Sequence, residues 1–410
     1  MIISAPAAFS SDAFALSGII GADALIIPKK TPLVKVETVF EQRIIASYLK
    51  QYLNSALLQA IYMKAVHPAQ ASSSIRSGLL FSPDSGMIQT NSQEKPRCFS
   101  RQEARNMKLL ILGGSGFVSG RLAQIAIAQG HEVWCVTRGN RPIPEDVHAL
   151  TCDAHDPAAL RAALASAQLQ WDAALDCICR DAASASVDLS VLPAFTNRLL
   201  VISTDSVYHP AYKRVPQDET GVYLHDGGYG SSKRQMEEVF LDAAAHSESP
   251  FAWTIFRPGH IFGAGSQVGC FPEHSRQPDL IARMKRGEPL RLVGGGKFLI
   301  HPIYVDDLCR VLLESIPVST AFNEIFCIGG PDIVSNAAYY ILLGEILNVP
   351  VTIEEIPLAG YLEAHPQFSG HLCHRAYSLE KLRHTGIALP STPLRAGLQK
   401  QVEWLLSLAR

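Results

Sequence analysis

From Met107 to its end, the chain alternates short unbroken runs of apolar residues with longer stretches that carry apolar residues at helical spacing. The short runs predict strands at 109–112, 132–136, 149–152, 173–178, 198–203 and 253–256. Helical patterns lie between them, for example at 157–167. Buried strands that alternate with helices are typical of an α/β protein with a doubly wound parallel sheet and helices on both faces.

Residues 1–106 do not fit this alternation. Apolar residues at helical spacing over 40–66 predict an amphipathic helix, and the Ser-rich polar segment 71–105 is typical of a linker or a disordered tail. We therefore expect the fold to begin at Met107 and the preceding part to be an extension, partly helical or disordered, which is vestigial, appended or not native. A transit peptide is the alternative; the Ser and Ala content favours it and the shortage of early arginines does not.

Composition narrows the class of protein. The 410 residues are 47% hydrophobic and 18% charged, as in soluble globular proteins, and no apolar run is long enough to span a membrane. A net charge of −2 does not indicate the excess of positive charge that is typical of nucleic-acid-binding proteins. Nine scattered cysteines suggest reduced thiols in a cytoplasm, and the clusters at 177–179 and 371–374 lack the spacing of a metal site, so no metal is expected.

A glycine cluster at 113–120 stands between the first strand and a helical pattern at 121–129. Gly113 permits a tight turn, and Gly116 lets the backbone approach a diphosphate that would bind the amide groups of the next helix. An ordinary strand-to-helix turn is the alternative interpretation.

The ends of the next two strands carry candidate contacts for the nucleoside of such a cofactor. Arg138 stands where an acidic residue is expected for NAD, and a guanidinium there can pair with a 2′-phosphate, which favours NADP over NAD. Asp153 follows the third strand, where its carboxylate can accept from the adenine amino group. The alternative interpretation of Arg138 is a solvated arginine in a loop. That of Asp153 is a side chain that caps a turn.

Two further segments carry candidate catalytic residues. Thr204 follows the fifth strand, and Tyr229 and Lys233 open a helix with one turn between them, so that they share a face. A free tyrosine has a pKa of roughly 10, and a nearby ammonium favours the phenolate. The residues therefore predict hydride transfer at an alcohol or ketone, with Thr204 holding the oxygen, Tyr229 exchanging the proton and Lys233 also contacting the nicotinamide ribose.

From Met107 to about Leu408 the chain resembles the extended short-chain dehydrogenase/reductase superfamily, and specifically its NAD-dependent epimerase/dehydratase family. The motifs that carry this resemblance are 113–119 (G-x-x-G with Ser119 in place of a third glycine), 203–208, 229–233, 257–263, 303–308 and 377–383. The resemblance implies a Rossmann-type domain over 107–261 and a smaller α+β substrate lobe over 262–410, with the chain returning to the first domain near 297–320. It also implies a possible homodimer through the helices at 181–192 and 229–245.

Together, the residues and the resemblance predict an enzyme that binds a nicotinamide cofactor and a small substrate, sugar-like or another carbonyl compound, away from membranes. The expected cofactor contacts are Gly113, Gly116, Phe117, Val118, Arg138, Asp153, Lys233 and Pro258.

Three departures from the family pattern bear on the substrate. Ser206 replaces the acid that sugar dehydratases place after Asp205, so water elimination is not expected. His260 and Ile300 stand where members acting on nucleotide sugars carry an Asn and an Arg, so a nucleotide-sugar substrate is less favoured, although His301 or Lys297 could compensate.

The glycine turn, the following strand and its Thr-Arg-Gly end also resemble a divergent branch that includes chloroplast stem-loop RNA-binding proteins. A non-catalytic nucleotide-binding or RNA-binding scaffold is therefore the alternative function. The presence of Thr204, Tyr229 and Lys233 together favours the enzyme, and the slightly acidic balance does not favour nucleic acid.

Overall fold

The computed structural model describes residues 106–246 and 250–408. The helix expected over 40–66 and the linker expected over 71–105 lie outside these residues.

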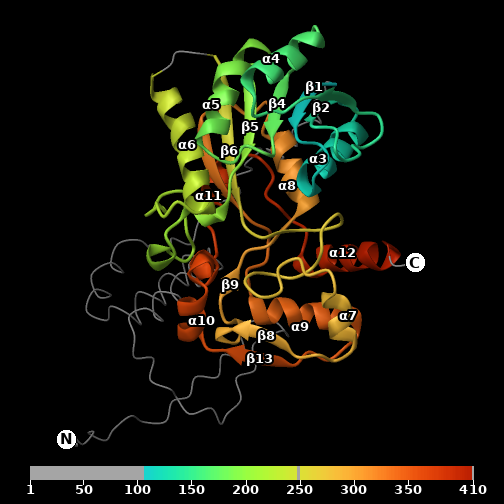
Figure 1. Ribbon diagram of the computed structural model, residues 1–410, viewed down its shortest axis with the longest axis vertical. Helices are drawn as coiled ribbons and strands as arrows, with labels where there is room; N and C mark the ends of the chain where they lie inside the picture. The colour runs from blue at the N-terminus through green and yellow to red at the C-terminus, as the bar shows by residue number, and fades with distance from the viewer. Residues whose placement is uncertain (1–105, 247–249, 409–410) are drawn as a thin grey trace, which may run out of the picture. The chain divides into compact units, whose positions relative to one another are not determined.

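A seven-stranded parallel sheet forms the upper half of the molecule in Figure 1, with the strand order β11-β6-β5-β4-β1-β2-β3. Its strands are β1 (Lys108–Leu112), β2 (Glu132–Thr137), β3 (His148–Thr151), β4 (Ala173–Asp176), β5 (Arg198–Ile202), β6 (Ala252–Pro258) and β11 (Glu324–Ile328). The six expected strands and the doubly wound fold are confirmed. β4 ends at Asp176, earlier than expected, because the Asp176 carboxylate accepts from the amides of Ile178 and Cys179.

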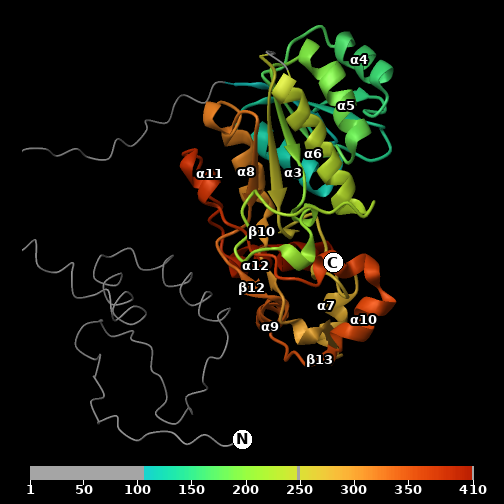
Figure 2. The same ribbon diagram turned by 90° about the vertical axis from the view of Figure 1, so that its left-hand side faces the viewer.

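Helices cover both faces of this sheet (Figure 2). One face carries α4 (Pro157–Ser166), α5 (Ala182–Val191) and α6 (Tyr229–His246); the other carries α3 (Phe117–Ala128), α8 (Val305–Glu314) and α11 (Glu380–His384). The alternation of side chains along β1 explains the two layers. Leu109 and Ile111 pack with α3 and α8, whereas Leu110 and Leu112 pack with the helices of the opposite face.

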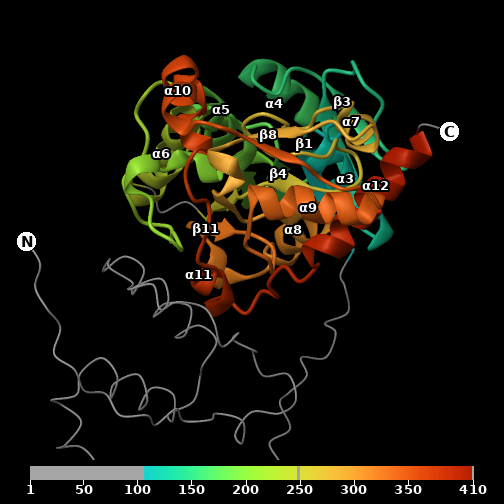
Figure 3. The same cartoon turned by 90° about the horizontal axis from the view of Figure 1, so that it is seen from below.

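The remaining elements form a smaller lobe with its own apolar core, which includes the buried Tyr339 and Tyr340. Its elements are α7 (Leu280–Lys285), β8 (Leu290–Val293), α9 (Asn336–Leu347), β13 (Ile353–Ile356), α10 (Leu358–Ala364), α12 (Leu394–Leu408) and the paired short strands β7 (Ile261–Phe262) with β10 (Ile303–Tyr304) and β9 (Leu299–Ile300) with β12 (Val334–Ser335). Figure 3 shows α9 and α12 side by side in this lobe.

The chain passes between the two parts more often than the sequence suggested. It returns to the sheet at α8 and β11, and α11 packs on β11 after the lobe. The return therefore extends past 320 to Ile328 and recurs at α11. We keep the division at 261/262 as a proposal, with these returns assigned to the Rossmann-type part.

The eight cysteines in the part that the structure describes are free and are buried or half-buried. In the same residues, no helix combines the length and the apolar character that crossing a membrane requires.

Candidate active site

The turn after β1 requires glycine most strictly at Gly114. Its φ is +97°, and a Cβ there would overlap the Sγ atom of Cys135 on β2. Ser119, in place of the family's third glycine, is buried, and its Oγ accepts a hydrogen bond of 3.1 Å from the Gly116 amide. The substitution therefore closes the turn with a hydrogen bond and leaves the approach of helix and strand intact.

The start of α3 fits the diphosphate of a dinucleotide. Its first turn carries no acidic residue, and its N-cap, Gly116, has no side chain to accept from the next amides, so those of Phe117 and Val118 have no partner within the helix. Pro258, buried at the carboxyl end of β6, is another expected contact at this edge of the sheet. These placements agree with the expected cofactor contacts, which remain a proposal.

The two residues expected near the nucleoside both lie at strand ends. Arg138 follows β2, is exposed, and makes no ion pair with any residue that the structure describes. Asp153 is exposed after β3, and its Oδ1 accepts a 3.0 Å hydrogen bond from the His155 amide. Asp153 therefore caps the turn, as the alternative interpretation held, and a contact with adenine would involve its remaining oxygen.

Thr204, Tyr229 and Lys233 meet at the carboxyl end of β5. Tyr229 begins α6, and Gly230 lets that helix approach closely, because a Cβ there would overlap the Ser206 carbonyl oxygen. Thr204 lies close enough to Tyr229 to favour the phenolate, and its own hydroxyl donates to Asp205 Oδ1 at 3.5 Å. Lys233 is buried, and its Nζ donates to the carbonyl oxygens of Cys179 at 2.5 Å and Ile202 at 2.7 Å.

Lys233 does not lower the pKa of Tyr229 in this structure, contrary to our expectation. Loss of solvation raises the pKa of Tyr229, although 62% of the residue is exposed, and the nearby Thr204 only partly opposes this. The ammonium is held on two backbone carbonyls, and burial lowers the pKa of Lys233 itself. Tyr229 is therefore a protonated donor here, as reduction of a ketone requires.

A buried ion pair, which the sequence did not predict, fixes α6 against the sheet. The guanidinium of Arg257 on β6 donates from Nε and Nη2 to the Glu237 carboxylate at 2.8 and 2.7 Å, and both residues are at most 1% exposed. Glu237 also accepts from the Ser203 hydroxyl at 2.7 Å, and Arg257 donates to the Tyr208 hydroxyl at 2.6 Å. Because Glu237 lies one turn after Lys233, this pair positions the catalytic end of α6.

Two buried carboxyl groups, also unpredicted, lie beside Lys233. Asp176 at the end of β4 and Asp188 on α5 lie close enough to affect each other, and burial raises the pKa of both, most for Asp188. They bring possible ligand atoms within 4.8 Å of one another and of Cys179 Sγ. The raised pKa values favour the protonated, neutral form of these carboxyl groups.

The sequence suggested that His301 or Lys297 could compensate for the arginine missing at Ile300. Both ring nitrogens of His301 are engaged, Nε2 with the Gly330 carbonyl and Nδ1 with the Tyr377 amide, and Lys297 lies 3.8 Å from Glu355. His301 is therefore not available to replace the arginine missing at Ile300, which is itself buried, whereas compensation by Lys297 stays a prediction.

The cations near the reacting groups come from elsewhere in the chain. Arg375 lies 3.5 Å from Asp205, and Arg276 acts on the pKa of Tyr229 and lies over the Phe117 ring at 5.9 Å. Burial, together with these two arginines, lowers the pKa of His260 to about 3, so its imidazole is neutral. Sequence reasoning missed both arginines because they lie in loops outside the motifs.

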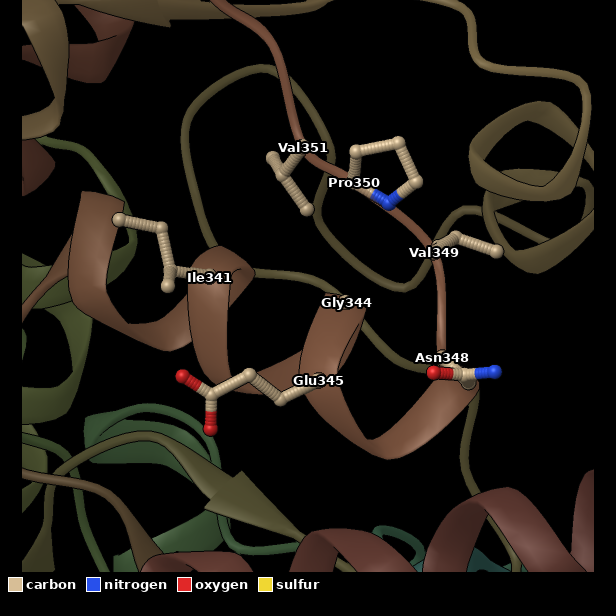
Figure 4. Close-up of a pocket in the computed structure, with 7 residues that line it drawn as sticks. All are labelled: Ile341, Gly344, Glu345, Asn348, Val349, Pro350 and Val351. Atoms are coloured by element: carbon tan, nitrogen blue, oxygen red, sulfur yellow. The ribbon is translucent and has the colours of Figure 1, made fainter.

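A separate hollow of about 350 Å³ lies at the end of α9 (Figure 4). Its lining residues are Ile341, Gly344, Glu345, Asn348, Val349, Pro350 and Val351. None of them is a candidate catalytic or cofactor-binding residue, and Glu345 is paired with Arg395.

Comparison with known proteins places this site in a family. The model of the NAD dependent epimerase/dehydratase family matches residues 109–329. The solved UDP-glucose 4-epimerase of Thermotoga maritima, in complex with UDP-glucose, superposes with a TM-score of 0.62 over 74% of this chain and 100% of that one, at 20% identity. That likeness shows the fold.

Three curated relatives are similar in sequence over part of the chain. A 2′-dehydrokanamycin reductase of Streptomyces kanamyceticus is 27% identical over 52% of this chain and 59% of its own length, so the chain spans about three fifths of that relative. A 2-alkyl-3-oxoalkanoate reductase of Stenotrophomonas maltophilia is 27% identical over 68% of this chain and 85% of the relative. A chloroplast stem-loop binding protein of 41 kDa of Arabidopsis thaliana is 22% identical over 54% and 58%.

Replacing Glu237 with Gln should lower the free energy of unfolding by about 3–5 kcal/mol, because it leaves the Arg257 guanidinium buried without its counter-charge. Urea denaturation measures this. The matched control is Glu238→Gln, next along the same helix but at the surface, which should change stability by about 0.5 kcal/mol or less. A loss below about 1 kcal/mol in Glu237→Gln would show that the pair does not hold α6.

Replacing Asp188 with Asn should make the melting temperature less dependent on pH. Since the pKa of Asp188 is raised in the folded state, the unfolded chain releases its proton first, and the wild type loses stability as the pH rises above about 4. An amide has no proton to lose. The melting temperature of the variant relative to wild type should therefore rise by about 2–4 °C between pH 5 and pH 8.

Asp242→Asn, at an exposed position of α6, is the control and should show no such trend. An equal loss of melting temperature at both pH values in Asp188→Asn would contradict the raised pKa of Asp188.

Proposed function

The chain belongs to the NAD dependent epimerase/dehydratase family, as its motifs indicated, and we propose that it transfers hydride at a secondary alcohol or ketone of a small substrate. The observation that carries this proposal is that the start of α6, with Tyr229 and Lys233 one turn apart, packs against the turn that follows Thr204. These three groups lie at the carboxyl edge of the sheet, where ligands bind in doubly wound folds.

A nicotinamide dinucleotide fits the described residues. The glycine turn and the uncapped start of α3 can receive its diphosphate, and the nicotinamide ring supplies or accepts the hydride when it is bound. We propose NADP(H) as the preferred form because Arg138 offers a guanidinium, and no carboxylate, at the end of β2.

The protein's own residues would orient the substrate oxygen and donate the proton to it. Thr204 orients the substrate oxygen by a hydrogen bond, and Tyr229, protonated in this structure, donates its proton to that oxygen during reduction. Lys233 has two of its three N–H groups on backbone carbonyls, so one remains to bind a ribose hydroxyl. In the oxidative direction Tyr229 takes the proton back.

Net reduction of a ketone is the form of the reaction that we favour. The names of two relatives describe reductases, one of a dehydro-aminoglycoside and one of a 3-oxoalkanoate. Asp205 is engaged with Tyr377 at 2.8 Å and with Arg375, and despite burial these partners lower its pKa, so it is a poor proton donor for water elimination. The scaffold function, to which the stem-loop relative points, would leave the Thr204 and Tyr229 pair without a use.

We also retain the homodimer through α5 and α6 as a proposal. The two helices pack against each other on one face of the sheet, and the resemblance implied that they form the face of the dimer.

Calorimetric titration of the full chain with NADP(H) and NAD(H) tests the cofactor proposal. We expect NADP(H) to bind more tightly, by about tenfold or more, because one additional charge-assisted contact is worth roughly 1.5 kcal/mol. Arg138→Asp should reverse the preference, since a carboxylate repels the 2′-phosphate. Arg141→Asp, in the loop that follows β2, controls for charge alone. If neither nucleotide binds, the proposal of an enzyme is wrong and the scaffold function is favoured.

Tyr229→Phe should lower kcat for ketone reduction by about 10²–10⁴-fold, because it removes only the proton donor. Steady-state oxidation of the reduced cofactor with a panel of small ketones measures this, and cofactor affinity should stay unchanged. Tyr212→Phe removes a phenol of similar exposure outside the site and serves as the control. Full turnover by Tyr229→Phe on a substrate that the wild type reduces would refute the mechanism.

A further inference from the structure

Arg375 is a buried cation whose hydrogen-bonding capacity is only partly used. It lies between the lobe and α11, and 4% of the residue is exposed. Its Nη1 atom lies 3.5 Å from Asp205 Oδ2 and 3.5 Å from His371 Nδ1. Its Nε and Nη2 atoms are buried and have no hydrogen-bond partner in the structure.

The two unpartnered atoms form one edge of the guanidinium. Nε–H and Nη2–H point the same way, and their spacing matches the two oxygens of a carboxylate. Buried donors without partners cost free energy, and a buried guanidinium ordinarily uses its fork. Neutralising Asp205 accounts for Nη1 only, because that contact leaves Nε and Nη2 without a partner.

The charges around this edge favour an anion. Asp205 is paired with Arg375 and Tyr377 and also interacts with Lys213, and a second arginine, Arg276, acts on the same buried His260. Burial lowers the pKa of His371 to about 4, so this ring is neutral near pH 7. The cations near the site therefore exceed its one carboxylate, among the residues that the structure describes.

The edge is also close to the reacting groups. The Thr204 hydroxyl lies 3.5 Å from Asp205 Oδ1, and Asp205 Oδ2 lies 3.5 Å from Arg375. A group bound at Arg375 and an oxygen bound at Thr204 can therefore belong to one small molecule. The half-buried His371, stacked on Phe271 at 4.2 Å, lies 3.5 Å from Nη1, so that its ring leaves Nε and Nη2 unpartnered.

We propose that the substrate carries a carboxylate a few bonds from its reacting carbon, and that the Nε and Nη2 edge of Arg375 binds this carboxylate in a bidentate manner. The proposal rests on Thr204 and Tyr229 being the site of hydride transfer. It makes the substrate an oxo or hydroxy acid, and Arg375 the residue that selects it over neutral ketones.

Calorimetry on the full chain, with and without NADP⁺, tests the carboxylate directly. The probes are 3-hydroxybutanoate and 3-hydroxyoctanoate, each compared with the neutral 1,3-diol of the same length. We expect at least one acid to bind about tenfold or more tightly than its diol, as two charge-assisted hydrogen bonds allow. If neither acid binds better than its diol, the proposal is wrong, whatever the variants do.

The variant Arg375→Lys distinguishes the bidentate hydrogen bonding of a guanidinium from the effect of its positive charge. It keeps a cation beside Asp205 but cannot form the bidentate contact, so the preference for the acid should fall by about tenfold. Arg291→Gln, at an exposed position of β8, removes a charge outside the site and should keep the preference. A preference unchanged in Arg375→Lys would also overturn the proposal, and thermal melting checks that each variant is folded.

Turnover separates this proposal from the reaction itself. Reduction of 3-oxooctanoate and 2-octanone with the reduced cofactor should show the same preference in kcat/KM. Turnover of both ketones at equal rates would contradict the carboxylate site and leave hydride transfer standing. Preferential acid binding without turnover of either would support the carboxylate site and count against the reaction.

Discussion

The bidentate pair between Glu237 and Arg257 is the interaction on which the site depends. It joins α6 to β6 in the interior, where the Arg257 guanidinium has the Glu237 carboxylate as its counter-charge and Glu237 is also 3.2 Å from Arg234. The Ser203 hydroxyl adds β5 to the same cluster. The helix that carries the proposed proton donor is therefore fixed to the two strands whose ends form the floor of the site.

The geometry of the reacting groups follows from that anchor. With α6 held at Glu237, its first turn meets the turn after β5, and Gly230 removes the side chain that would keep them apart. Lys233, one turn before Glu237, then reaches carbonyls at the ends of β4 and β5. The same cluster positions Tyr208, which stacks on Tyr377, the residue that binds Asp205. The anchor thus connects the proton donor to the groups that we propose bind the substrate.

Short stretches of sequence were enough to predict the features that depend on neighbouring residues. Unbroken apolar runs gave the first six strands, and the spacing of Tyr229 and Lys233 placed them at the start of one helix. The pair of Glu237 with Arg257 was invisible because its members stand 20 residues apart on different elements, and a glutamate in a helical pattern resembles a solvated residue. The pKa of Tyr229 could not be read from spacing either, since it depends on burial and on what holds the Lys233 ammonium. β11 and Arg375 lie after segments of the lobe, so that only the folded chain brings them to the sheet.

Transfer of deuterium tests the central claim most directly. The full chain is incubated with a panel of small ketones and oxo acids and with NADPH that carries deuterium at both C4 positions of the nicotinamide, and the products are analysed by mass spectrometry. The account predicts one deuterium on the carbinol carbon of a reduced product, because the site aligns a carbonyl oxygen on Thr204 and Tyr229 for hydride delivery. Products that acquire no deuterium, or a cofactor that binds and yields no product from any member of the panel, would contradict it.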